Sequence, residues 1–183
     1  MKRDINSNGY IFLYTTILVV VVAALLTAAA LWLQPYQQIN REKEKRVMIL
    51  SAAGANEDGN IELIEGDLPV YLVNGSIPVL SMQGNGLWGP IWGYIAIAAD
   101  GKTVVGVTFD HKSETPGLGG EITTEKFQHQ FAGKQVMDHG DVIPVEFDAI
   151  TGATKTSNGV KEMIDNTLEK YTAYLKKFAE KGE

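Results

Sequence analysis

With 183 residues, of which 45% are apolar, the chain can hold one ordinary domain and some additional material. The 22 acidic residues outnumber the 16 basic ones, so nucleic acid and anionic lipid surfaces are poor partners for it. The chain has no cysteine, which excludes disulfides and lipoprotein processing.

The amino-terminal segment predicts a membrane span that follows a short tail of residues 1–9. Residues 10–33, from Tyr10 to Leu33, contain no Asp, Glu, Lys or Arg. As a helix they would reach about 36 Å, against a hydrocarbon core of about 30 Å. A cleaved signal peptide is the alternative, but this apolar run is longer than the apolar part of a signal peptide. We therefore expect residues 10–33 to anchor the chain in a lipid bilayer, while the Lys and Arg distribution leaves its orientation open.

The rest of the chain predicts a stalk and linker over residues 34–66 and a folded domain over residues 67–183. Short strands are expected at 69–73 and 77–82, around the turn pair Asn74-Gly75. Two apolar runs, 91–99 and 102–109, flank Asp100-Gly101, a pair that a tight type I′ hairpin prefers. A short helix is expected at 123–134, an edge or bulged strand containing Pro144 at 141–147, and an amphipathic helix at 158–178. This order predicts an α+β domain, in which helices pack on an antiparallel sheet.

Familiar catalytic and metal-binding patterns are missing or incomplete. Residues 84–89 match G-x-G-x-x-G by letter, but Pro90 and a strand follow where a dinucleotide site needs a helix. The three histidines, His111, His129 and His139, lack the spacing of a metal site and are expected to be surface or structural residues. The sequence also lacks a nucleophile elbow, so we expect neither a catalytic triad nor a metal.

Two glycine-containing stretches are the strongest candidates for a site. "KSETPGLGGE", residues 112–121, is a long loop of small residues around Leu118, which suits either plain turns or the close approach of a flat ligand. "DAITGATKTSNGVKEM", residues 148–163, puts Thr151, Thr154, Thr156 and Ser157 around Gly152 and Ala153, just before the predicted helix. Capping needs one hydroxyl and there are four. The alternative is a phosphate on Thr154, held by the amides of residues 155–157 and by the charge of Lys155.

These stretches, with "GLWGPIWGY" and the amino-terminal span, resemble the C subunit of the sodium-translocating NADH:quinone reductase family. The G subunit of Rnf complexes shares the same FMN-binding domain, but "GLWGPIWGY" and "NSNGYIFLY" favour the sodium pump. The resemblance covers nearly the whole chain, the linker least. Thr151 and Gly120 stand where many members have serine and alanine.

The resemblance implies an electron-transfer subunit with FMN joined by a phosphoester to Thr154. A flavin transferase would attach the FMN, recognising a pattern that begins at Asp148. The subunit would relay electrons between redox centres of a multisubunit complex in the bacterial inner membrane, its soluble domain on the extracytoplasmic side, without itself binding NADH or reducing quinone. The expected cofactor-binding residues are Trp88, Glu114, Thr115, Leu118, Gly119, Thr151, Gly152, Ala153, Lys155, Thr156 and Ser157.

Two other functions fit the residues. The chain could be a tethered module that binds free FMN or another phosphometabolite noncovalently. It could also be a scaffold whose span and stalk hold a complex together.

Overall fold

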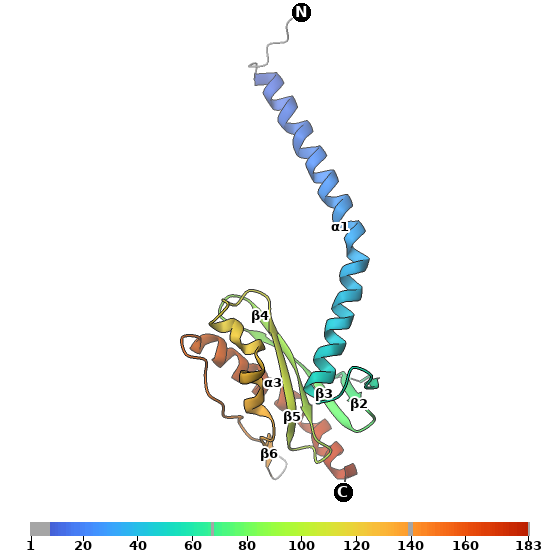
Figure 1. Cartoon of the computed structure of the whole chain (residues 1–183), viewed down its shortest axis with the longest axis vertical. Helices are drawn as coiled ribbons and strands as arrows, with labels where there is room; N and C mark the ends of the chain where they lie inside the picture. Colours follow the sequence, from blue (N-terminus) through green and yellow to red (C-terminus); the bar gives the residue numbers. More distant parts are fainter. Residues whose placement is uncertain (1–7, 67, 139–140, 183) are drawn as a thin grey trace, which may run out of the picture. The chain divides into compact units, whose positions relative to one another are not determined.

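The computed structural model describes residues 8–66, 68–138 and 141–182 (Figure 1). Residues 1–7 of the predicted tail, the first residue of the predicted domain (Asp67) and His139 lie outside this part. The chain divides into two compact units, Met1–Glu44 and Lys45–Glu183, and each is described by itself. The elements are α1 Asn8–Ala52, β1 Ile61–Ile64, β2 Val70–Val73, β3 Ile77–Asn85, β4 Pro90–Ile97, β5 Val104–His111, η1 Gly119–Thr123, α2 Glu125–Gln128, η2 His129–Phe131, β6 Met137–Asp138, β7 Asp141–Val142 and α3 Thr154–Gly182.

The first unit consists of the greater part of α1. This helix is long and apolar enough to cross a membrane, with a mean hydropathy of 2.6 over its most apolar window. The hydroxyls of Thr15, Thr16 and Thr27 each donate to the carbonyl four residues earlier. Its threonines therefore have hydrogen-bond partners inside the helix, as a helix that crosses a membrane would need.

The second unit is built on a five-stranded antiparallel sheet in the order β1-β2-β3-β4-β5 (Figure 1). On one face, α3 packs its buried stripe against apolar side chains of the strands. The other face is covered by the end of α1, where Ile49, Leu50 and Ala52 pack against Val79 and Ala96. This arrangement confirms the predicted α+β fold with an antiparallel sheet and packed helices.

The structure confirms the turn at Asn74-Gly75 but not the type I′ hairpin predicted at Asp100-Gly101. Asn74 and Gly75 have φ angles of 51° and 71°, and the amide of Ser76 donates to Val73 O at 3.1 Å, which makes this the type I′ turn. The strands around Asp100 instead end at Ile97 and resume at Val104. Here the Asp100 carboxylate accepts from the amides of residues 102 and 103, so a longer loop closed by a side chain replaces the expected two-residue hairpin.

Four other elements differ from the sequence-based expectation. Strand β1 lies within the predicted linker of residues 34–66, and α1 continues to Ala52. Only Asp141 and Val142 of the predicted strand 141–147 pair with another strand. Pro144 has no amide to donate, and the carbonyls of Val145 and Glu146 accept from the lysines Lys161 and Lys134 instead of from a strand. Finally, α3 begins at Thr154 rather than at 158, so the hydroxyl-rich segment forms its first turn.

Candidate functional site

A tight turn leads directly into α3. The amide of Ala153 donates to Ile150 O at 2.9 Å, and Gly152 between them has a φ of +80°. The Ser157 hydroxyl accepts from the Ile150 amide at 3.0 Å and donates to Ala153 O at 3.1 Å. Ser157 is therefore the residue that fixes the turn to the helix, and it is almost fully buried.

The open end of α3 presents donors and one exposed hydroxyl. The first helical hydrogen bond runs from the Ser157 amide to Ala153 O at 3.0 Å. Among the described residues, the amides of Thr154, Lys155 and Thr156 have no acceptor. This corrects the predicted trio of amides, residues 155–157, by one position. Thr154 and Lys155, which carry two of these amides, are both exposed.

The loop between β5 and η1 is ordered by its own turns. Thr115 O accepts from the amides of Leu118 at 3.1 Å and Gly120 at 3.0 Å, and Gly117 has a φ of +74°. The Glu114 amide donates to His111 Nδ1 at 3.2 Å, so His111 is structural, as the sequence predicts. Residues 115–118 are nevertheless exposed, which leaves this turn open to a ligand.

Glu114 joins this loop to two other segments. Its Oε1 accepts from the Trp88 amide at 2.7 Å, and its Oε2 accepts from the Thr156 hydroxyl at 2.6 Å. The side chain is buried. Burial raises the pKa of the carboxyl, but hydrogen bonds from Thr156 and from the amides of residues 87–89 outweigh this, and the pKa lies below its ordinary value.

The two glycine-containing stretches are thus brought together, as expected for a shared site. A Cβ added to Gly152 would lie 3.0 Å from Leu118 Cδ2, so the TGAT turn and the tip of the 112–121 loop are in contact. Leu118 is 41% exposed, Leu87 50% and Trp88 66%, which leaves three large apolar side chains open to solvent on the segments that flank Glu114. Exposed apolar groups beside free amides and a free hydroxyl suit a ligand with a flat apolar part and an anionic part.

The predicted cofactor-binding residues divide into buried and exposed ones. Glu114, Gly119 and Thr156 lie at the buried junction, and Ala153 is buried in the turn. Thr115, Thr151 and Lys155 are exposed around it. The sequence-based list of site residues did not include Gly86, which lies against Glu114, or the exposed Leu87. Both belong to the "GLWGPIWGY" stretch, on which the family resemblance partly rests.

Asp148 is held by a residue that the sequence did not indicate. Its amide donates to Gln130 Oε1 at 2.8 Å, and Gln130 Nε2 donates to Asp148 O at 3.4 Å. The Asp148 side chain is exposed beside a hollow of about 500 Å³, which is also lined by Lys126 and Phe127. A glutamine eighteen residues away carries no sequence signal for this contact.

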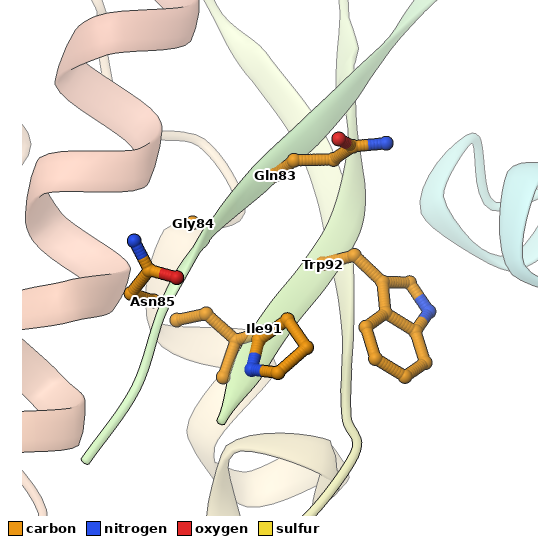
Figure 2. Close-up of a pocket in the computed structure, with 6 residues that line it drawn as sticks. Gln83, Gly84, Asn85, Ile91 and Trp92 are labelled. Carbon is orange, nitrogen blue, oxygen red and sulfur yellow. The ribbon is translucent and has the colours of Figure 1, made fainter. Parts of the chain in front are cut away.

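A second hollow, of about 480 Å³, lies where β3 ends and β4 begins (Figure 2). Its lining residues are Gln83, Gly84, Asn85, Pro90, Ile91 and Trp92. Figure 2 shows the side chains of the paired residues Gln83 and Trp92 extending away from the neighbouring helix. None of the predicted site residues lines this hollow, and we do not assign the site to it.

Comparison with known proteins gives consistent results. Residues 86–169 match the family model described as FMN-binding domain. Over 113 residues the chain is 41% identical to the C subunit of the Na(+)-translocating NADH-quinone reductase of Vibrio vulnificus, covering 52% of this chain and 44% of the relative. For the C subunit of the Chlamydia muridarum reductase the identity is 31% over 159 residues, covering 72% and 50%. The chain spans about half the length of the curated relatives it matches.

Two solved structures share the fold. The crystal structure of the Na(+)-translocating NADH-quinone reductase C subunit from Parabacteroides distasonis has a TM-score of 0.67 and 30% identity, covering 78% of this chain and 96% of that one. The crystal structure of Shewanella oneidensis NqrC has a TM-score of 0.62 and 22% identity, covering 75% and 99%, and it supports the fold alone.

Proposed function

Because the chain belongs to the family of the C subunit of the Na(+)-translocating NADH-quinone reductase, we propose that it is a membrane-anchored electron-transfer subunit with FMN esterified to Thr154. The relatives reported above are named as the C subunit of this reductase, which favours this family over the G subunit of Rnf complexes. In this proposal, residues 10–33 anchor the chain in the bilayer. The flavin domain lies within the second compact unit.

The observation that carries the proposal is the exposed Thr154 hydroxyl at the open end of α3. Three unpaired amides accompany it among the described residues, and Lys155 adds a positive charge nearby. A phosphate ester at this oxygen would find donors and the positive end of the helix dipole at the same place. The residues present therefore fit the phosphate of FMN.

The exposed apolar residues fit the remainder of the cofactor. Leu118 and Trp88 lie on segments that the Glu114 carboxylate holds to the start of α3. They would bind an isoalloxazine ring and shield it from water, while Thr115 and Gly119 complete the loop around it. FMN supplies one- and two-electron redox chemistry when bound, and the protein positions it and sets its potential.

The wider assignments rest on the family. We propose that the domain faces the extracytoplasmic side of the bacterial inner membrane and passes electrons between redox centres of neighbouring subunits. A flavin transferase would recognise the exposed segment that begins at Asp148, which Gln130 holds in place. The protein would then contribute to NADH:quinone reduction without binding either substrate.

Acid precipitation of the full-length protein distinguishes a covalent flavin from a bound one. The chain is co-expressed with a flavin transferase, purified from membranes in detergent and precipitated with acid. We expect yellow colour and flavin fluorescence to stay with the protein in the wild type and to be absent in Thr154→Ala. Complete release of the flavin into the supernatant would favour a noncovalent binding module.

A functional test separates electron relay from scaffolding. Membranes that contain the complete complex with Thr154→Ala should lose NADH-driven quinone reduction while keeping the assembled subunits. Full activity of these membranes would favour the scaffold.

A further inference from the structure

We propose that Glu114 is a positioning residue that holds the apolar part of the flavin site against the attachment helix, and that it does so before any cofactor is present. The inference rests on the proposed function for its purpose, because it concerns how that same site is organised. Its structural content, however, is a property of the protein alone.

The first argument is connectivity. The two oxygens of Glu114 bind groups that lie 26 residues before it and 42 residues after it in the chain, the Trp88 amide and the Thr156 hydroxyl. The 86–89 loop, the 112–121 loop and the first turn of α3 therefore meet at one carboxylate. Thr156 lies two residues after Thr154, so this contact ties the loops to the turn that carries the attachment oxygen.

The second argument is steric. A Cβ on Gly119 would overlap Glu114 Oε2, and a Cβ on Gly86 would lie 2.6 Å from Oε1. Real Cβ atoms essentially never make contacts this short, so both positions need glycine for the carboxylate to occupy its place. Two backbone segments thus approach the carboxylate more closely than any side chain would allow.

The third argument is chemical. Both partners are donors, and an ionised carboxylate is a pure acceptor, so each hydrogen bond has the correct polarity without an alternative arrangement. The side chain is only 4% exposed, and Thr156 is only 1% exposed. Removing the carboxylate would leave a buried hydroxyl and an amide without partners, which would release the Leu87-Trp88 segment from α3.

The direct test is hydrogen–deuterium exchange on the full chain in detergent, with Thr154→Ala as background so that no flavin is attached. Peptides that contain the Trp88 amide are compared between Glu114→Ala, Glu114→Gln and a control, Glu125→Ala, which removes a carboxylate at the start of α2. We expect at least tenfold faster exchange at Trp88 in Glu114→Ala and no change in Glu125→Ala. Glu114→Gln should restore most of the protection, because its amide can accept from Trp88 and donate to the Thr156 oxygen.

A second pair of variants keeps the test decisive should Glu114→Ala fail to fold. Thr156→Val removes the donor to Oε2 while keeping the side-chain volume, and Thr156→Ser retains the hydroxyl. Faster exchange at Trp88 in the valine variant, rescued by serine, supports the inference. Unchanged Trp88 exchange in Glu114→Ala, or equal exchange in Thr156→Val and Thr156→Ser, overturns it.

The flavin supplies an independent readout. In flavinylated protein with Thr154 intact, Glu114→Ala should raise flavin fluorescence and its quenching by iodide about twofold or more, because the ring is less well held, and Glu114→Gln should reverse most of the rise. Identical values in all variants would count against the positioning role. If the wild type carries no acid-stable flavin, the proposed attachment fails, but the exchange result on Glu114 stands or falls by itself.

Discussion

The four hydroxyls around Gly152 have separate roles. Ser157 fixes the turn to the helix, and Thr156 donates to Glu114 from a buried position. Thr151 and Thr154 remain exposed, and Thr154 is the one beside the free amides. Among the described residues, no hydroxyl accepts from the first amides of α3, so neither Ser157 nor Thr156 is a helix cap. The Thr154 hydroxyl remains exposed for the proposed phosphate.

Substituting Gly152 tests the contact with Leu118. Gly152 and Gly133 have similar φ angles, +80° and +76°, but a Cβ meets Leu118 only at Gly152, whereas nothing lies within 4 Å of Gly133. Each Ala substitution should cost about 1–2 kcal/mol of stability because of the left-handed backbone. Only Gly152→Ala should also slow flavin attachment severalfold, measured as acid-stable flavin against time. Equal attachment rates in the two variants would contradict this account of the turn.

The Glu114 carboxyl should make stability depend on acid pH. Its folded-state pKa lies below the ordinary value of 4.5, so the ionised form stabilises the fold at neutral pH. This contribution is complete above the ordinary pKa and is lost as the pH falls through the lower folded-state pKa. In urea unfolding, the stability advantage of the wild type over Glu114→Gln should therefore shrink as the pH falls below 4.5. A constant difference across this range would contradict the assignment.

At the scale of elements, α3 approaches the sheet more closely than its amphipathic pattern indicates. A Cβ at Gly159 would overlap Asn85 O, at the end of β3. Ala is normally preferred to Gly within a helix by about 1 kcal/mol. Here we expect Gly159→Ala to destabilise the protein by about 1–3 kcal/mol, because the helix must move away from the strand.

Asn158→Ala is the matched control for this effect, since Asn158 is the exposed neighbour in the same helix. It should change stability by about 0.5 kcal/mol or less. Urea unfolding of both variants in the same detergent gives the comparison. Stabilisation by Gly159→Ala would show that the close approach to β3 is not maintained.

Strong local patterns predicted most of the elements, and long-range contacts determined the rest. The stripe from Val160 to Phe178 and the alternating strands around Asn74 were sufficient to predict the α+β fold. The end of strand pairing at Val142 was not predictable, because lysines 134 and 161 take the carbonyls that a strand would use. The site followed the same division: its glycines and hydroxyls were visible in the sequence, whereas the partners of Glu114 and Asp148 arise from folding.

At the scale of the whole molecule, the absence of cysteine allows a direct test of orientation. A single cysteine introduced at the exposed position Lys155 would be the only thiol in the chain. Intact spheroplasts should label Lys155→Cys with a membrane-impermeant maleimide, whereas Ser7→Cys should be labelled only after lysis. The reverse pattern would place the flavin domain in the cytoplasm and contradict the proposed orientation.

The central claim is the covalent bond at Thr154, and intact-mass spectrometry tests it most directly. The full-length chain, co-expressed with a flavin transferase, should gain the mass of one FMN less one water, and peptide mapping should locate the addition on Thr154. The addition should disappear in Thr154→Ala and return in Thr154→Ser. A wild-type mass without the addition, or an addition that persists in Thr154→Ala, would contradict the account.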